Sequence, residues 1–504
     1  MVARLRRAKL LSGEDPHDPG HLDAHPLVRE YFGEQLRSER TEAWKECNRR
    51  LYNHYRALAP QLPDNFREME PLFLAVICGC NAGLFREALH EVYIPRIQRG
   101  NAFFAANVLK SRGALLSGLA QFFAHGDWRS PVQIGVEGQS LTAKDQLFIL
   151  MQAGLYLTST RGLGAPEARI CYESAESLCR SLNDPRLLCL ALMGQWRYSL
   201  VTEKLTATLG IAQRVYALAQ EQNESAMMIG ACRPLAVTFY YLGDFETARQ
   251  YAIRGVQIWR SGSVESHAED FGTPVVGCLC YQALCELHFG EIASSDATLS
   301  EAISLAKELN DMSALGFALW HAGCLAHLKS DPSEVERCLS DLIELSTHHN
   351  FVNFVPLATV LRGWARSASG DSAEGLAWIE DGIENWRATG AILDLPFLLA
   401  LKAEALHLEN RNCEALEAIE EAEALVEITE RRNWCAELHR LRGVSLTALG
   451  ADESQIEASF HEAIRIAKQQ KSISLEKRAE ASYAEYRRRK ASASGERGFR
   501  LPHC

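Results

Sequence analysis

The chain has 504 residues, of which 47% are hydrophobic and 23% charged, and its formal net charge at pH 7 is −11. This length exceeds one ordinary globular core, so the chain forms either several domains or a linear repeat array. The acidic balance argues against a broad nucleic-acid-binding surface, which needs a basic face. The basic runs Arg4–Lys9 and Arg487–Lys490 lie at the chain ends and are interpreted as solvated flanks.

The compartment is predicted from three further observations. No apolar run approaches the roughly 18 residues of a membrane span. The charged N-terminal residues are not followed by the apolar segment of a secretory signal. The 15 cysteines are scattered through apolar helical segments, as is typical of reduced, buried thiols. We therefore expect a cytoplasmic protein with no membrane contact.

Turn signals divide the chain into helical segments of similar length. In chain order the irregular ones are Gly83, Gly126, Gly162, a turn near Glu203, and Gly243. Five regular turns follow at Gly290, Ser330, Gly370, Asn410 and Gly450, and subtraction of their numbers gives a constant step of 40 residues. A fixed period of this size indicates helix–turn–helix units that bury their apolar faces only by stacking on one another.

Small residues recur at fixed distances from these turns. Seven positions before each regular turn stand Ala283, Gly323, Gly363, Ala403 and Gly443. Twelve positions after the turns stand Ala302, Leu342, Gly382, Ala422 and Glu462, of which the last breaks the pattern, although Ala463 is adjacent. A small side chain in the first helix of a unit lets the second helix approach closely.

The spacing and the small positions resemble the tetratricopeptide repeat, whose usual period is about 34 residues. A period near 40 resembles the variant repeats in the sensor arms of MalT-type regulators. The predicted fold is therefore all-α: a right-handed α-α superhelix, or tetratricopeptide-like solenoid, of about ten repeats.

Four stretches carry a more specific resemblance. They are Leu361-Arg362-Gly363-Trp364-Ala365, Trp386-Arg387-Ala388-Thr389-Gly390-Ala391, Ala436-Glu437-Leu438-His439-Arg440-Leu441-Arg442-Gly443 and Ser474-Leu475-Glu476-Lys477-Arg478-Ala479. Together they look like the C-terminal tetratricopeptide region of bacterial STAND-type ATPases and of the adenylate/guanylate cyclases fused to them. The resemblance covers residues 190–485 approximately.

The run from Leu22 to Leu36 resembles the junction that closes the nucleotide-binding and winged-helix part of such ATPases. The resemblance implies a remnant of that junction at 1–43, a helical connector at 44–73, the solenoid at 74–490 and a flexible tail at 491–504. Family members carry an upstream phosphate loop with Gly-Lys-Ser/Thr, whereas this chain has no Gly-Lys pair. We therefore expect a sensor half without its ATPase motor.

Two groups of residues are candidate contact points. Trp196, Trp320 and Trp364 fall on first helices, which usually line the concave side of a solenoid, although packing between units is the alternative role. The step from Gly243 to Gly290 is 47 residues, and its surplus lies at 261–274, an insertion of the kind that often forms a loop on the binding face. This loop holds His267, Glu269, Asp270 and Phe271.

The predicted function is a non-enzymatic scaffold or sensor that binds a protein partner or a small signalling ligand on the concave face, without a cofactor or a metal. The alternative is a regulatory fragment or subunit of a STAND ATPase or nucleotide cyclase, acting on a nucleotide-binding domain in trans. A third class, an enzyme, depends on acid/base chemistry by the loop acids, for which solvated surface charge is the competing explanation.

Overall fold

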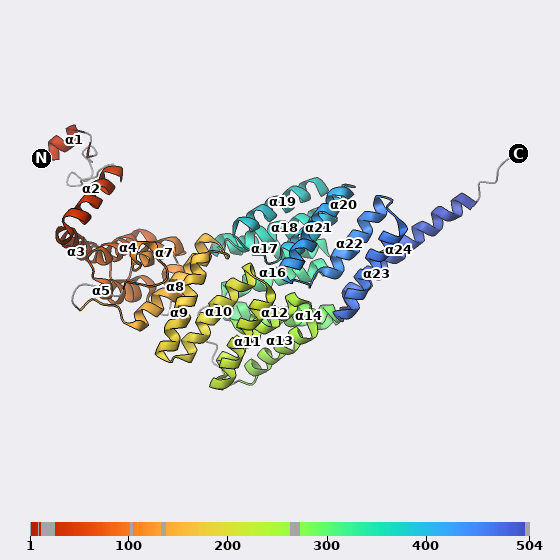
Figure 1. Cartoon of the computed structure of the whole chain (residues 1–504), viewed down its shortest axis with the longest axis horizontal. Coiled ribbons are helices and arrows are strands. Elements are labelled where there is room, and N and C mark those ends of the chain that lie inside the picture. Colours follow the sequence, from red (N-terminus) through yellow and green to blue (C-terminus); the bar gives the residue numbers. More distant parts are fainter. Residues whose placement is uncertain are drawn as a thin grey trace. The chain divides into compact units, whose positions relative to one another are not determined.

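The computed structural model describes residues 2–8, 10–11, 26–100, 104–107, 109–132, 138–262, 273–349 and 351–498 (Figure 1). Every regular element among these residues is a helix, and the β-type pairing there is limited to an isolated bridge between Phe123 and Pro131. The all-α prediction is thereby confirmed. None of the described helices combines the length and the apolar character needed to cross a membrane. The chain divides into two compact units, Met1–Ala153 and Gly154–Cys504.

The first unit contains mostly short helices. They are α1 (Val2–Arg7), α2 (Pro26–Glu39), α3 (Thr41–Leu58), α4 (Phe66–Asn81), α5 (Phe85–Glu87), the π-helix η1 (Ala88–Gln98), α6 (Phe104–Asn107), α7 (Arg112–Ala120) and the 3-10 helix η3 (Ala124–Gly126). The turn expected at Gly83 separates α4 from α5. The turn at Gly126 is also present, but residues 127–132 and 138–142 form no second helix after it. Pro131 lacks the N–H that a helix interior needs, and Gly138 has a φ of 76°.

The second unit is a regular succession of paired helices. They are α8 (Ala143–Arg161), which crosses the unit boundary, α9 (Pro166–Leu182), α10 (Pro185–Thr202), α11 (Leu205–Gln222), α12 (Ser225–Leu242), α13 (Phe245–Arg260), α14 (Pro274–His288), α15 (Ile292–Glu308), α16 (Met312–Leu328), α17 (Pro332–His349), α18 (Phe354–Ala368), α19 (Ser372–Ala388), α20 (Leu395–Leu408), α21 (Asn412–Thr429), α22 (Cys435–Ala448), α23 (Glu453–Gln469) and the single terminal helix α24 (Ile473–Gly498). The tetratricopeptide-like solenoid is thus confirmed.

The turns that define the 40-residue step lie between the two helices of each pair. The backbone there enters the left-handed region that ends many helices, with φ of 78° at Gly290, 58° at Ser330, 103° at Gly370, 60° at Asn410 and 67° at Gly450. The sequence period therefore corresponds to a repeated helix-ending geometry. Glycine and asparagine adopt this conformation at low cost, which is why these turns could be recognised from the sequence.

The small residues before the turns permit close helix contact, as predicted. A Cβ atom added at Gly323 would lie 2.7 Å from Leu339, and one at Gly443 would lie 2.9 Å from the Phe460 ring. Of these three glycines, Gly363 in α18 has the closest contact, and its neighbour is a backbone atom. A Cβ at Gly363 would lie 2.5 Å from the carbonyl oxygen of Gly375 in α19. A backbone atom cannot rotate away, so this position requires glycine.

We expect Gly363→Ala to lower the free energy of unfolding by about 1–3 kcal/mol, because the added methyl forces α18 and α19 apart. Gly210→Ala is the matched control, since Gly210 also lies inside a helix but a Cβ there meets no atom within 4 Å. Removing glycine flexibility there should stabilise the protein by up to about 1 kcal/mol. Urea titration of both variants measures the difference, and equal effects would show that the α18–α19 contact is not tight.

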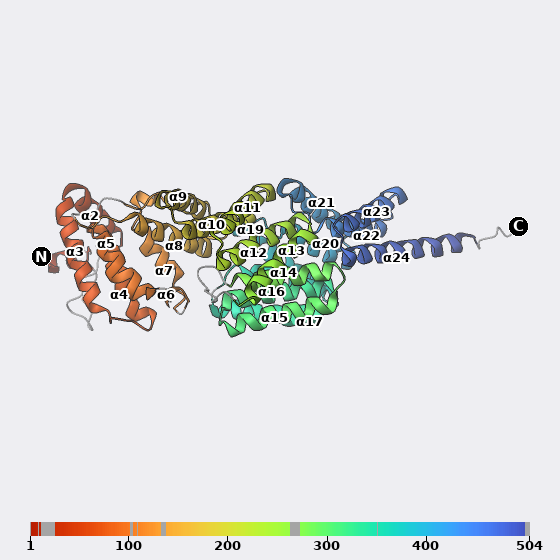
Figure 2. The same cartoon turned by 90° about the horizontal axis from the view of Figure 1, so that it is seen from below.

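Successive turns of the superhelix touch along their edges. The links that precede α20 and α22 lie against the ends of α10 and α12. Figure 2 shows the helices of the second unit from below. The Ile392 amide donates to the Val201 carbonyl at 2.8 Å, and the Arg432 amide donates to the Tyr241 carbonyl at 2.7 Å. We call this contact the seam and define it by these four residues together with Arg431. The seam closes the solenoid upon itself.

Arg431 is the buried centre of the seam, with 1% of its surface exposed. Its guanidinium donates hydrogen bonds to the carbonyl oxygens of Leu200 and Glu203, at the end of α10. Beside it, the amide and the hydroxyl of Thr206 both donate to the carboxylate of Glu430, which is 224 residues further along the chain. Both contacts join helix pairs that are five pairs apart in the order of elements.

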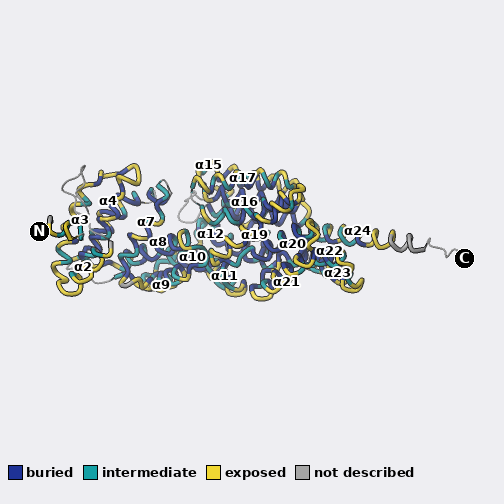
Figure 3. The backbone as a smooth tube through the Cα atoms, turned by 90° about the horizontal axis from the view of Figure 1, so that it is seen from above, coloured by how far each residue is buried: buried dark blue, intermediate teal, exposed yellow. Residues whose placement is uncertain are grey.

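The first helices of the central pairs are buried on nearly all sides as a result. In α14 and α16 almost every residue is buried, including positions on opposite faces of each helix. Figure 3 shows this burial as dark blue segments inside the second unit, with exposed residues along its outer edges. One apolar core runs from Cys189 to Leu475. A helix that is apolar all round has to be covered all round, and here the closed superhelix covers it.

Candidate functional site

The three tryptophans proposed as contact points lie inside the solenoid. Their exposed fractions are 1% for Trp196, 5% for Trp320 and 3% for Trp364. The Trp196 indole N–H donates to the Thr238 hydroxyl at 3.1 Å, and the Trp364 indole N–H donates to the Glu404 carboxylate at 3.0 Å. This placement favours the packing role, because a ligand would have to displace neighbouring side chains to reach these rings.

The loop residues His267, Glu269, Asp270 and Phe271 lie outside the described residues. The chain is described up to Gly262 on one side and from Thr273 on the other. The amide and the hydroxyl of Thr273 donate to the Asp311 carboxylate at 2.8 and 3.1 Å. This contact fixes the start of α14 against the start of α16, independently of the loop.

An open groove of about 530 Å³ lies on the second unit, between the end of α8 and the helices α18 and α19. Arg161, Asn353, Asp381 and Asn385 bring charged and amide groups to it, and Val352, whose surface is 51% exposed, brings an apolar side chain. The volume is within the range of about 300–1,000 Å³ that is typical of ligand pockets. Sequence reasoning missed this groove, because its walls come from segments about 200 residues apart.

The hydrogen bonds and ion pairs of three groove side chains show which polar groups the groove presents. The Asn385 amide nitrogen donates to the Asp381 carbonyl at 2.9 Å, and the residue is otherwise exposed. Arg161 forms an ion pair with Glu167 at 2.5 Å on the rim. The side-chain oxygen of Asn353 is covered but accepts no hydrogen bond from the described residues. The groove therefore offers polar groups to a ligand that carries both donors and acceptors.

A network of charged side chains lies deeper, on α16, α20, α22 and α24. The Glu437 carboxylate accepts hydrogen bonds from Arg440 at 2.6 Å and from Arg478 at 2.8 Å. His327 approaches the Glu404 carboxylate at 3.7 Å, and Arg440 approaches it at 4.0 Å. No pattern in the sequence marked these residues as a group, because they belong to four different helices.

Electrostatics indicate that this network is internally balanced. Burial alone would raise the pKa of Glu437, but the charges of Arg440 and Arg478 outweigh it and hold the pKa well below its usual range. Burial would also raise the pKa of Glu404, but the neighbouring His327 and Arg440 outweigh it, and this pKa falls to about 2. Burial lowers the pKa of His327 despite the nearby carboxylate, so this imidazole is neutral at pH 7. Two glutamates thus offset two arginines, and the network holds the core together.

The buried cysteines show no features of a reactive or metal-binding site. Burial raises the pKa of the Cys280 thiol to about 12, and it raises the pKa of the neighbouring Cys278 thiol further. Both stay protonated at neutral pH, which disfavours nucleophilic attack. Within the described ranges, no group of three or more His, Cys, Asp or Glu side chains is arranged to hold a metal ion.

Comparison with known proteins gives one sequence relative of interest. No protein-family model matches the chain. An uncharacterized protein of Rhizobium meliloti (strain 1021) is 24% identical over 344 residues, which cover 68% of this chain and 33% of that protein. The chain therefore spans about a third of the length of the curated relative it matches.

Similar solved structures are helical repeat proteins. A Rap protein complexed with competence and sporulation factor superposes with a TM-score of 0.47 at 11% identity, over 69% of this chain and 99% of that one. Aspartyl phosphate phosphatase F from Bacillus subtilis gives 0.41 at 12%, over 66% and 85%. A STAND protein with a tetratricopeptide repeat sensor from Pyrococcus horikoshii gives 0.35 at 12%, over 89% and 74%. The likeness concerns helical architecture alone.

Proposed function

We propose that this protein is a non-enzymatic repeat scaffold that binds a short segment of a partner protein in the open groove between α8, α18 and α19. The observation that carries the proposal is the groove itself, an open hollow of about 530 Å³ on the surface of a solenoid with a continuous apolar core. A partner reaches it without displacing packed side chains.

The lining favours a peptide over a purely apolar ligand. Peptide main chain presents one N–H donor and one carbonyl acceptor per residue. Asn385 carries an exposed amide group, which both donates and accepts, while Val352 offers contact to an apolar side chain of the peptide. Arg161 is paired with Glu167 on the rim and Asp381 adds a negative charge, so the groove does not favour a strongly acidic segment.

We expect peptides selected from a random display library against the whole protein to lose at least about tenfold in affinity for Asn385→Arg, because the longer side chain enters the groove. Glu384→Arg is the matched control, since this neighbouring residue is exposed on the same helix but does not line the groove. Calorimetry with one selected peptide measures both. Equal losses of affinity in the two variants would show that the added positive charge, and not blockage of the groove, weakens binding, and would contradict the proposal.

The loop at 261–274 remains a proposed second contact for the same partner. Replacing residues 263–272 by a Gly-Ser segment should leave helicity and melting temperature nearly unchanged, because Thr273 anchors α14 independently. The same selected peptide should bind more weakly if the loop contributes. If the replacement unfolds the array, the loop is structural.

The alternative function, a sensor for a nucleotide-binding domain in trans, has one supporting observation. In the Rhizobium relative, the matching segment belongs to a chain about three times as long as that segment. A neighbouring gene that encodes Gly-Lys-Ser/Thr would supply the candidate partner. Its rate of ATP hydrolysis should change on addition of this protein, and an unchanged rate would reject this role.

A further inference from the structure

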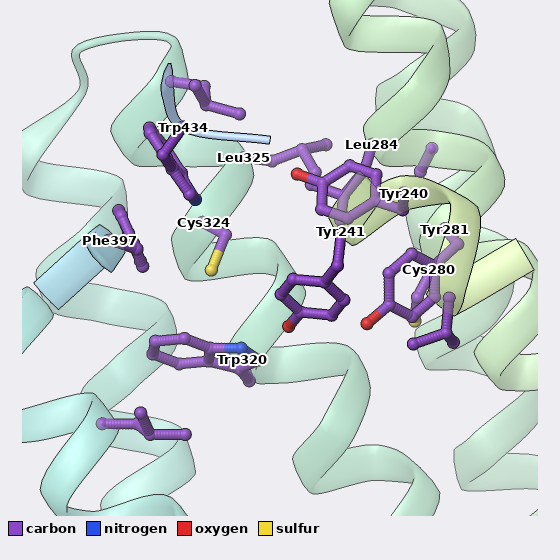
Figure 4. Packing of buried hydrophobic residues seen from close by; sticks show 14 of the residues in the cluster. Tyr240, Tyr241, Cys280, Tyr281, Leu284, Trp320, Cys324, Leu325, Phe397 and Trp434 are labelled. Carbon is purple, nitrogen blue, oxygen red and sulfur yellow. The ribbon is translucent and has the colours of Figure 1, made fainter. Parts of the chain in front are cut away.

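A small cavity inside the second unit is walled by aromatic rings. The rings belong to six residues on α12, α14, α16, α20 and the link before α22: Tyr240, Tyr241, Tyr281, Trp320, Phe397 and Trp434. We call this space the aromatic cavity (Figure 4). Its volume of about 20 Å³ accommodates one occupant the size of a water molecule.

The walls of the aromatic cavity are held by ring contacts between helices. Phe397 and Trp434 stack with centroids 4.3 Å apart, and Tyr240 meets Tyr281 edge to face at 5.3 Å. Figure 4 shows the Tyr241 hydroxyl directed toward Trp320 across the space between α12 and α16. Aromatic faces carry partial negative charge, so any ring that turns a face to this space would attract a cation.

Asp394 adds a carboxylate to this wall. It occupies the position before α20 with a φ of 61°, yet its side chain makes no capping hydrogen bond to the helix. Instead, the carboxylate accepts a hydrogen bond from the Tyr241 hydroxyl at 2.8 Å. The usual reason for an aspartate at a helix start, capping of the free amides, therefore does not explain its presence.

The charge of Asp394 has no close counter-ion in the described part of the chain. No Lys, Arg or His nitrogen of those residues lies within 4.0 Å of it. The guanidinium of Arg431 acts on it electrostatically from a greater distance. That group is directed elsewhere, to the carbonyl oxygens of Leu200 and Glu203. A partly buried carboxylate with a single hydroxyl donor has capacity for further donors.

We propose that the aromatic cavity binds the primary ammonium group of a small amine, with Asp394 as the counter-charge. A primary ammonium head has about the size of water and donates three hydrogen bonds, which suit a carboxylate with free acceptor sites. A quaternary ammonium donates none, and its head group alone exceeds the cavity. This site is separate from the groove of the proposed function, so either can fail without the other.

The ionisation of the site supports this assignment. Burial raises the pKa of Asp394 to about 6, against the hydrogen bond from Tyr241 and the charge of Arg431. The other titratable groups that face it do not change charge near this pH. Burial raises the pKa of Tyr281 and of Cys324 and lowers that of His321 to about 4. Amine affinity should therefore follow the ionisation of Asp394 alone.

The test is titration of the whole protein with methylammonium chloride at constant ionic strength, followed by tryptophan fluorescence and calorimetry. Trp320 and Trp434 line the cavity and report its occupation. We expect saturable binding at pH about 8, about tenfold weaker at pH about 5 because the carboxylate is then mostly protonated. Asp394→Asn should lose at least about tenfold in affinity.

Asp452→Asn is the matched control, because Asp452 also precedes a helix, α23, without a capping hydrogen bond. It should bind methylammonium as the wild type does. The proposal is overturned if the wild type gives no saturable response, if Asp394→Asn binds equally well, or if sodium competes at the same concentration as methylammonium. Should Asp394→Asn not fold, the wild-type pH profile decides, and affinity that does not fall toward pH about 5 overturns the proposal.

Discussion

Arg431→Ala is expected to destabilise the second unit by up to about 3 kcal/mol and to loosen the seam. Each hydrogen bond from a charged donor contributes about 1.5–3 kcal/mol, and two such bonds reach the end of α10. Burial lowers the pKa of Arg431 from 12.5 to about 10, which corresponds to a cost of about 3 kcal/mol for keeping the cation inside. The two bonds together contribute about 3–6 kcal/mol, so their loss outweighs the recovered cost by up to about 3 kcal/mol.

Arg432→Ala is the control for this prediction, because Arg432 is exposed and contributes its backbone amide to the seam. The free energy of unfolding of Arg432→Ala should stay within about 0.5 kcal/mol of the wild-type value. Hydrogen exchange should accelerate at the end of α10 in Arg431→Ala only. Equal exchange in both variants would show that backbone contacts alone hold the seam closed.

Glu437→Leu is expected to be more damaging still, at about 3–5 kcal/mol, because it leaves the buried Arg440 and the partly buried Arg478 without their shared carboxylate. Replacing all three residues by leucine or methionine should recover most of the loss, since apolar side chains of similar size carry no desolvation cost. Glu427→Leu, at an exposed position, is the control. Urea unfolding measures the series, and a triple variant no better than the single one would contradict the electrostatic explanation.

The same network predicts the response to acid. The pKa of Glu404 in the folded protein, about 2, lies below the ordinary value of 4.5. A carboxylate with a lowered folded pKa stabilises the protein above the unfolded value and loses that contribution as the pH falls toward the folded one. The contribution of Glu404 should therefore decline between pH 4.5 and about 2, and chemical unfolding at stepped pH detects it.

The solenoid was predictable from the sequence because its determinants are local. Gly290 and Gly450 end helices through backbone conformation, and Gly363 permits a contact between neighbouring helices of one pair. The seam was not predictable in this way, because Tyr241 ends α12 whereas Arg432 lies far along the chain, in the link before α22. One signal pointed to it: α14 and α16 have no polar face, which an open concave surface would need.

The candidate sites were harder to predict for the same reason. Trp320 and Trp364 stand on first helices as expected, but closure of the superhelix turns that face into core. Asp394 resembles an ordinary helix-start residue in the sequence, and only the structure shows its carboxylate directed to Tyr241. The groove at Asn385 combines segments that no local pattern connects.

The seam also constrains how such a chain can evolve. An open solenoid can gain or lose a repeat by duplication or deletion, since each repeat contacts only its neighbours. Here Thr206 meets Glu430 at a separation of 224 residues, so one added pair between them would bring a different link opposite α11. Every seam contact would change partner at once. We therefore expect homologous chains with the seam to share the number of repeats between these points and to vary in length elsewhere.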